Sequence, residues 1–120
     1  KSVLLDQTII AGIGNIYSDE ILFASNIHPL TLVKNLKTNH FKDLYKNMIT
    51  ILRSGINFGG DSMSDYRNLE GKPGSFQYHH KAYRQTKKTC QKKGCRGIIT
   101  RMVIGGRSSH FCPVHQKLLR

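Results

Sequence analysis

The sequence has few acidic residues for its number of basic ones, and the shortage is greatest near its C-terminus. The 120 residues include 19 Lys and Arg but only seven Asp and Glu, a formal net charge of +12. Between Lys81 and Arg120 there are eleven basic residues and no acidic one. A merely solvated basic face would carry interspersed acids, so this segment favours a polyanionic partner, and nucleic acid in particular.

Long apolar runs are also lacking. No stretch approaches the roughly 18 apolar residues that cross a bilayer, and Asp6 interrupts the first apolar run, where a signal peptide would be hydrophobic. We therefore expect no membrane association. The sequence starts at Lys1 without an initiator methionine, and an amphipathic helix already in progress there favours a piece of a longer protein. There is no internal repeat and no low-complexity tract.

Cysteine is scarce, and an odd count of three argues against a disulfide framework because one thiol is left over. The spacing Cys90-x4-Cys95-x16-Cys112-x2-His115 instead indicates a tetrahedral site for one Zn²⁺ ion. About thirty residues with so few large apolar side chains cannot bury a core, so the metal would supply most of their folding free energy. His110 competes as the fourth ligand, although the x2 spacing favours His115. The alternative is three reduced thiols and a surface histidine.

The N-terminal segment predicts two helices joined by a tight turn. We expect helices over about 3–11 and 15–25, separated by Gly12-Ile13-Gly14. Asn15 is suited to cap the second helix, and the acids at 19 and 20 suit its early turns. The N–H groups at such a helix N-terminus can bind an anion, and a phosphate is the obvious candidate. Many similar helical hairpins, however, bind nothing.

The remaining elements follow from periodicity and turn residues. A helix is expected from Thr38, capped by that residue and ended by glycines at 55 and 59–60. Residues 61–75 read as a long loop, with short strands at 76–79 and 81–83 and a hairpin of strands 98–104 and 108–111. Arg107 would lie near the tip of that hairpin, where it either clamps a phosphate or only solubilises the tip. One helix face is expected to be buried core: Phe41, Leu44, Tyr45, Met48, Ile51, Leu52 and Ile56.

The sequence resembles the C-terminal half of bacterial formamidopyrimidine-DNA glycosylases, a family shared with endonuclease VIII. The resemblance covers essentially the whole chain, and the matching motifs are LLDQ (4–7), AGIGNIYSDE (11–20), IHPL (27–30), Gly-Gly (59–60), GKPG (71–74) and GGRSSHFCPVHQ (105–116). It implies a mainly α fold with a small β zinc finger. The implied units are a helix–two-turn–helix bundle over 1–60, a flexible lesion-recognition loop over 61–75 and a zinc-stabilised β-hairpin over 76–120.

The resemblance also implies the site residues. Asn15 would match the asparagine that contacts a phosphate beside the lesion, and Arg107 the phosphate-gripping arginine of the finger. The family's finger usually has four cysteines, whereas here His115 stands last and the first knuckle is two residues longer. GKPG fits the formamidopyrimidine branch better than endonuclease VIII. The further implied residues are Gly14 and Tyr17 on the DNA-binding surface and Ser64, Asp65, Tyr66 and Arg67 in the lesion loop.

The function implied is the DNA-binding part of a base-excision-repair glycosylase and AP lyase that removes oxidised purines, 8-oxoguanine and formamidopyrimidines, from duplex DNA. The family's catalytic proline and glutamate belong to a separate N-terminal domain, so we expect no catalytic residue in this chain and no activity from it alone. The expected partners are damaged double-stranded DNA and that domain, for a monomer at the bacterial nucleoid in the cytoplasm.

Two alternatives remain at this point. One is an endonuclease VIII-type glycosylase acting on oxidised pyrimidines, whose distinguishing features lie partly in the lesion loop and partly in the missing domain. The other is a non-catalytic, zinc-dependent nucleic-acid-binding module, because helix–two-turn–helix elements also occur in a ribosomal protein that binds RNA. The GKPG loop and the zinc finger argue against this second alternative.

Overall fold

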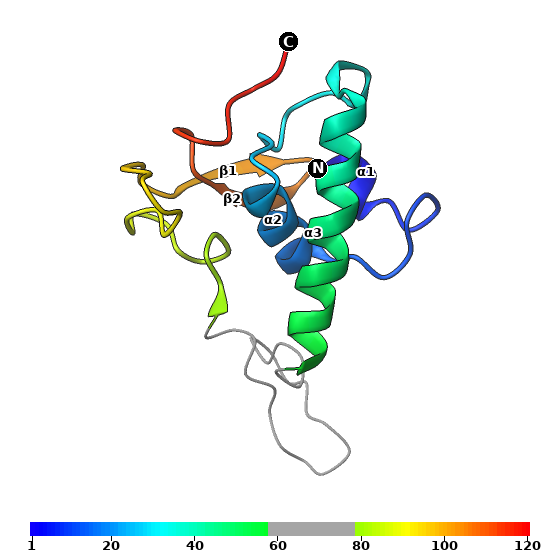
Figure 1. Ribbon diagram of the computed structural model, residues 1–120, viewed down its shortest axis with the longest axis horizontal. Helices are drawn as coiled ribbons and strands as arrows, with labels where there is room; N and C mark the ends of the chain where they lie inside the picture. Colours follow the sequence, from blue (N-terminus) through cyan, green and yellow to red (C-terminus); the bar gives the residue numbers. More distant parts are fainter. Residues whose placement is uncertain (58–78) are drawn as a thin grey trace.

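The computed structural model describes residues 1–57 and 79–120. Its elements are α1 (Ser2–Leu5), α2 (Asn15–Ala24), a 3-10 turn η1 (Val33–Asn35), α3 (Thr38–Asn57), β1 (Thr100–Ile104) and β2 (Arg107–Phe111). Helix α2 packs against both α3 and β2, so it joins the helical part of the chain to the hairpin (Figure 1). The predicted fold class, mainly helical with one small β-hairpin, is confirmed. Within the described residues, no helix combines the length and apolarity that crossing a membrane requires.

Helix α1 is much shorter than the sequence predicted. The Oδ1 atom of Asp6 accepts hydrogen bonds from the backbone N–H of Thr8 at 2.9 Å and from its hydroxyl at 2.6 Å. Such a side-chain turn competes with helix continuation. The side chain of Gln7 then closes the following loop, because it accepts from the Gly12 N–H at 2.9 Å and donates to the Ile13 carbonyl at 3.0 Å. The prediction of a helix to residue 11 is therefore wrong.

Helix α2 contributes side chains to two separate apolar clusters. It begins at Asn15 as predicted and ends one residue early, at Ala24. Ile21 and Leu22 belong to a helical core, which also contains Leu4, Ile13 and Ile27. Phe23 belongs to a second cluster, formed with Ala82, Cys90, Ile99 and Cys112 from the C-terminal segment. One helix thus supports both halves of the molecule.

The contact between α2 and α3 depends on a glycine. The sequence predicted that Gly55 would help to end the helix, but α3 continues past it to Asn57, and Gly55 is buried. A Cβ atom at this position would collide with the hydroxyl and ring of Tyr17 on α2. Gly55 therefore serves the close approach of the two helices rather than helix termination.

The predicted buried face of α3 is only partly correct. Leu44, Met48 and Ile51 pack against the helical core and Leu52 is half-buried. Phe41, Tyr45 and Ile56 are instead 47%, 68% and 76% exposed. Periodicity identified the apolar face, but no described element covers the whole of it.

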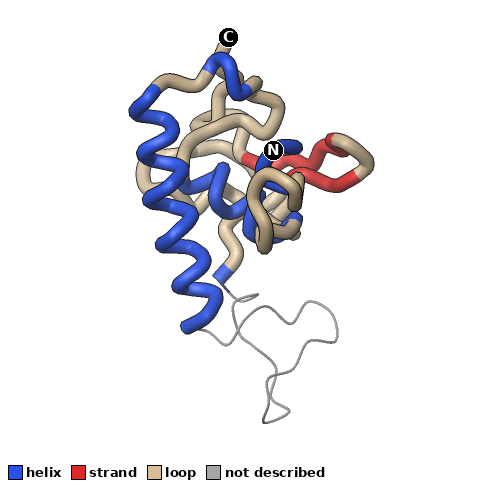
Figure 2. The backbone as a smooth tube through the Cα atoms, turned by 90° about the vertical axis from the view of Figure 1, so that its right-hand side faces the viewer, coloured by secondary structure: helices blue, strands red, loops and turns tan. Residues whose placement is uncertain are grey.

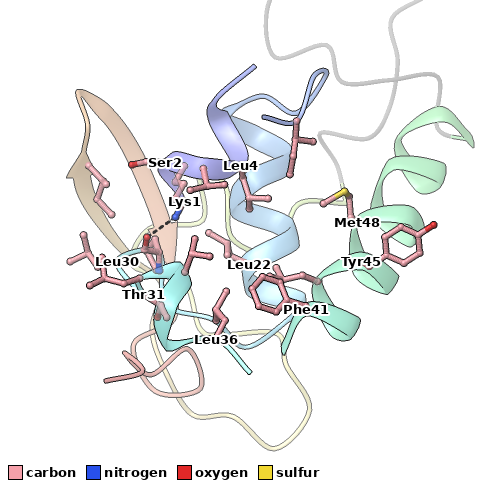
Figure 3. A pocket seen from close by; sticks show the side chains of 17 residues that line it. Lys1, Ser2, Leu4, Leu22, Leu30, Thr31, Leu36, Phe41, Tyr45 and Met48 are labelled. Carbon is pink, nitrogen blue, oxygen red and sulfur yellow. Dashed lines mark hydrogen bonds between the residues drawn. The ribbon is translucent and has the colours of Figure 1, made fainter. Parts of the chain in front are cut away.

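Two of these exposed side chains, Phe41 and Tyr45, line an open apolar groove with a volume of about 380 Å³ (Figure 3). The groove lies between α1, α3 and the segment 29–36, and Leu4 and Leu22 also line it. At its edge the N-terminal amino group of Lys1 donates a hydrogen bond of 2.9 Å to the carbonyl of Pro29.

The predicted hairpin is confirmed. Strands β1 and β2 pair antiparallel, with Ile104 opposite Arg107, and Figure 2 shows the turn of the hairpin projecting on one side of the molecule. Gly105 and Gly106 have φ values of +57° and +78°, as a two-residue type I′ turn requires. The loop 61–75 with its GKPG, Gly59-Gly60 and the expected strand residues 76–78 lie outside the described residues. The division into units at 60 and 75 stays a prediction.

Candidate metal centre and phosphate-contacting residues

The fold brings the four predicted metal-site residues together. Cys90, Cys95, Cys112 and His115 each offer one ligand atom, and all four atoms lie within 4.8 Å of one another. The Sγ atoms of Cys95 and Cys112 are 3.6 Å apart, and Nδ1 of His115 is 3.4 Å from Sγ of Cys90 and 3.6 Å from Sγ of Cys95. A tetrahedral Zn²⁺ site with the usual bond lengths separates two sulfurs by about 3.8 Å and sulfur from nitrogen by about 3.6 Å. The donor set and its spacing fit Zn²⁺.

The histidine of this cluster is oriented by α2. Its Nε2 atom lies 3.2 Å from the carbonyl oxygen of Phe23, and since a carbonyl only accepts, Nε2 donates and Nδ1 keeps its lone pair. Burial lowers the pKa of His115, which favours the neutral imidazole that binds metals. The competing candidate, His110, lies outside the cluster, with its Nδ1 3.1 Å from Oδ2 of Asp19.

The thiols differ in their electrostatic surroundings. Burial raises the pKa of the Cys90 thiol to about 12, whereas the backbone N–H of Gly97, 3.4 Å from the Cys95 sulfur, lowers the pKa of Cys95. Zn²⁺ binds thiolates, so binding at this site would release protons. Gly97 is also a close-packing position, because a Cβ atom there would collide with the sulfur of Cys112.

Glu20 attaches the C-terminal segment to α2. One carboxylate oxygen accepts the Lys81 N–H at 2.7 Å, and the other accepts the N–H groups of Ala82 and Tyr83 at 2.9 and 2.8 Å. The expected strand over 81–83 is therefore wrong, since this backbone bends around the carboxylate instead of pairing with another strand. Burial raises the pKa of Glu20, and the three N–H donors oppose that shift.

Asp19 attaches the hairpin to the same helix. Its Oδ1 is 2.6 Å from Nζ of Lys1, and its Oδ2 accepts the backbone N–H of His110 at 3.0 Å. Nζ of Lys1 also donates to the carbonyl of Ser108 at 2.8 Å. Asp19 is 1% exposed and Lys1 9%. Burial lowers the pKa of the Lys1 side chain, and the Asp19 charge opposes this.

The sequence predicted that Asp19 and Glu20 lie in the helix now seen as α2, but it did not predict that they attach the C-terminal segment and the hairpin to it. They follow the first turn of the helix, which contains no acidic residue, so the helix dipole does not explain them. Their burial could have been inferred from their position directly before three apolar residues, Ile21, Leu22 and Phe23, all of which are buried. Acidic residues next to such an apolar run are expected to need partners.

Asn15 does not cap α2. The N-cap residue is Gly14, whose backbone is extended, and no side chain bonds to the cap. Oδ1 of Asn15 is buried, and its side chain has no hydrogen-bond partner among the described residues. The first N–H bonded within the helix is that of Ser18, which donates to the Gly14 carbonyl at 3.0 Å. The preceding N–H groups of Asn15 and Ile16 therefore have no acceptor within the helix.

The side chain of Arg107, like that of Asn15, has no hydrogen-bond partner among the described residues. Arg107 is exposed and directly follows the Gly105-Gly106 turn, as predicted. Strand β2 begins at Arg107, one residue earlier than expected. In the part of the chain that the structure describes, the Arg107 guanidinium also forms no ion pair. Arg101 on β1 differs, because its Nε donates to the Ser108 hydroxyl at 2.9 Å.

Comparison with known proteins assigns the family. A family model described as the formamidopyrimidine-DNA glycosylase H2TH domain matches residues 1–67. The chain belongs to this family. It is 45% identical over 117 residues to the formamidopyrimidine-DNA glycosylase of Prochlorococcus marinus, a match covering 98% of this chain and 39% of that protein. The chain spans about two fifths of the length of that relative.

Solved structures of the family are similar as well. An FPG mutant of Lactococcus lactis in complex with a Fapy-dG containing DNA matches with a TM-score of 0.88 and 38% identity, over 98% of this chain and 42% of that one. The MutM (FPG) protein of Thermus thermophilus matches with a TM-score of 0.88 and 37% identity, over 98% and 44% of the two chains. The resemblance read from the sequence motifs is confirmed.

The other two implied DNA-binding residues, Gly14 and Tyr17, differ in their exposure. Gly14 is exposed beside Asn15. Tyr17 is half-buried and packs against the helical core and Gly55. The implied lesion-loop residues lie outside the described residues: Ser64, Asp65, Tyr66 and Arg67.

Proposed function

We propose that this chain is the DNA-binding portion of a base-excision-repair DNA glycosylase and AP lyase that removes oxidised purines, 8-oxoguanine and formamidopyrimidines, from duplex DNA. The observation that carries the proposal is the pair of unengaged side chains, Asn15 at an open helix N-terminus and Arg107 at the hairpin turn. The names of the relatives, and the Fapy-dG containing DNA bound by the Lactococcus lactis protein, support it.

The chemistry suits recognition of damage at any sequence. Helix N–H groups, an amide and a guanidinium bind phosphates, which position a protein on DNA without reading its sequence. An enzyme that acts on a base must extrude it, and sharp bending of the duplex assists extrusion. Two phosphate contacts on separate elements, held at a fixed spacing, can stabilise such a bend.

One structural Zn²⁺ ion, held by the three thiolates and Nδ1 of His115, would stiffen the finger. The chain's own contribution is to hold the ligands in place. The Phe23 carbonyl orients His115, and Glu20 holds the backbone of Ala82, which packs in the same apolar cluster as Cys90. The metal takes no part in bond cleavage under this proposal. It keeps β1 and β2 at a defined position relative to α2.

We also propose that the catalytic chemistry belongs to the part of the relatives that this sequence does not contain, and that the 120-residue chain alone binds DNA and cleaves nothing. The apolar groove supports docking of that part as a partner domain. Contiguous exposed apolar surface marks interaction sites, and six exposed large apolar side chains line the groove: Val3, Leu30, Leu32, Val33, Phe41 and Tyr45.

Docking can be tested with the N-terminal portion of the Prochlorococcus relative supplied as a separate polypeptide. Phe41→Glu places a charge in the groove and should abolish association measured by calorimetry. Ile56→Glu is the matched control, because Ile56 is exposed on the same helix and lies outside the groove. Equal association by both variants would remove the groove as the docking site.

DNA binding is tested by the affinity of the chain for duplexes with and without an abasic-site analogue, and for a folded RNA, at one fixed salt concentration. We expect preference for duplex DNA and about a tenfold loss of affinity in Asn15→Ala, the effect of losing one good phosphate contact. Thermal stability should stay unchanged, because Asn15 is not the cap. Preference for the RNA would favour a non-catalytic nucleic-acid-binding module instead.

Substrate choice needs the full-length enzyme. A lesion panel with 8-oxoguanine, formamidopyrimidine and oxidised-pyrimidine duplexes separates the proposed activity from an endonuclease VIII-type one. We propose that the enzyme acts as a monomer on chromosomal DNA in the bacterial cytoplasm, a proposal that the bacterial origin of the similar proteins supports.

A further inference from the structure

We propose that Asp19 is a positioning residue that sets the hairpin bearing Arg107 at a fixed place relative to the N-terminus of α2. This rests on the proposed function, because Asn15 and Arg107 are the phosphate contacts whose spacing it would control. Asp19 itself touches no DNA under the proposal. It acts through the backbone of β2.

The position of Asp19 on α2 makes this possible. It follows Asn15 by four residues, so it lies about one helical turn further along nearly the same face. From there its Oδ2 atom accepts the backbone N–H of His110, in the second half of β2, at 3.0 Å. A bond from the same helix face to the strand backbone fixes the distance between the helix N-terminus and β2.

The other carboxylate oxygen extends this link toward Arg107. It pairs with Nζ of Lys1, which donates at 2.8 Å to the carbonyl of Ser108, the residue next to Arg107. The strand is thus held at two places by one carboxylate, directly at residue 110 and through Lys1 at residue 108. The side chain of Arg107 projects from the end of this doubly held segment.

Burial makes the arrangement stiff. Asp19 is 1% exposed, and a buried charge that loses its partners is strongly destabilising. Any shift of β2 along α2 would break the His110 and Lys1 contacts together. The carboxylate therefore tolerates only one placement of the strand.

The other buried acid of α2 acts on a different part of the chain. Glu20 holds the backbone at 81–83, at the start of the C-terminal segment. Its hydrogen bonds go to that backbone and not to β2. Replacement of Glu20 therefore should not displace β2 as replacement of Asp19 would. Of the two buried acids of α2, only Asp19 contacts β2.

The test is a double-mutant cycle on DNA affinity between residues 19 and 107. In the wild-type chain Arg107→Ala should lower duplex affinity about tenfold, whereas in an Asp19→Asn chain the same change should cost less than about twofold, because the arginine is already misplaced. The Asn15→Ala effect should stay near tenfold in both chains. A purely structural role for Asp19 would leave the cost of Arg107→Ala unchanged, which would overturn the proposal.

Two controls keep the outcome unambiguous. Asp43→Asn makes the same charge change at an exposed position of α3 and should leave both mutational costs as in the wild type. Zinc content and circular dichroism verify that Asp19→Asn is folded. If Asp19→Asn does not fold, Lys1→Met is used in its place. This variant removes the link from Asp19 to the Ser108 carbonyl and leaves the His110 bond. A full tenfold cost of Arg107→Ala in the Lys1→Met chain would equally overturn the proposal.

Failure of the proposed function gives a different result. A wild-type chain with no duplex affinity, or one indifferent to both Asn15→Ala and Arg107→Ala, would refute DNA binding at these residues. A wild-type chain that responds to both, with an unchanged Arg107 cost in Asp19→Asn, would refute only the role of Asp19.

Discussion

The Nε2 atom of His115 donates a hydrogen bond of 3.2 Å to the carbonyl oxygen of Phe23. This bond connects the last residue of the Cys/His cluster to the last turn of α2. The two rings also meet edge to face, with centroids 4.6 Å apart. The position of the metal site is therefore fixed by the same helix whose other end carries Asn15.

Loss of one cysteine should affect only the C-terminal segment. Cys112→Ser removes a ligand from the cluster, so bound zinc should fall well below one ion per chain and the finger should unfold, because a structural metal's binding energy is folding energy. The helical core contains none of the cluster residues, so the α-helical circular dichroism signal should persist. Hydrogen exchange resolved along the chain checks this. A finger that stays protected without metal would show that packing alone folds it.

Zinc affinity should rise with pH. The raised pKa of Cys90 means that its thiol is protonated at neutral pH until the metal displaces the proton. The lowered pKa of His115 keeps its imidazole neutral and able to bind the metal near neutral pH, and protonation blocks binding only at more acidic pH. Competition with a chromophoric chelator between about pH 6 and 8 should show the affinity increasing, since each step up removes competing protons. An affinity independent of pH would exclude thiol deprotonation from the binding step.

Arg107→Ala should weaken binding to all duplex sequences alike and reduce the slope of log affinity against log salt by about one unit, the effect of one lost phosphate contact. Arg107→Lys is the control: it keeps the charge and the slope but loses the forked geometry, so affinity falls less. Titrations at several salt concentrations measure both. Identical slopes for Arg107→Ala and the wild type would remove this residue from the phosphate contacts.

Gly55→Ala should destabilise the chain. Replacing a helical glycine with alanine ordinarily stabilises by about 0.5–1 kcal/mol, but here the added methyl group would collide with Tyr17. Overpacking of this kind typically costs about 1–3 kcal/mol. Urea unfolding monitored by circular dichroism gives the sign directly, and a stabilised variant would show that the two helices can separate without cost.

The sequence predicted those features that depend on local rules. Gly105-Gly106 specified the turn, and the Cys/His spacing identified the cluster, because both are set by a few neighbouring residues. The apolar period of α3 gave the correct helix. It could not show which side chains are covered, since Phe41 and Tyr45 need a partner surface that no local pattern reveals.

The errors arose where a side chain replaced the expected backbone partner. Asp6 ended α1 early through its bonds to Thr8, and Glu20 took up N–H groups that were expected to pair in a strand. Asn15 has the right residue type for a cap but lies one position inside the helix. The Glu20 contacts join segments 62 residues apart, and the Asn15 outcome depends on a shift of one residue, neither of which composition specifies. The Asp6 turn is local, but the apolar pattern of the segment favoured a continuing helix over this competing side-chain turn.

Under the proposed function, the metal-stiffened finger and α2 bind one duplex together. The most direct test measures zinc content and duplex affinity of the same sample before and after chelation at fixed salt. One zinc per chain, with affinity lost on its removal and restored on its return, is the predicted result. A chain that contains no zinc, or one that binds the duplex equally well after chelation, would contradict the claim.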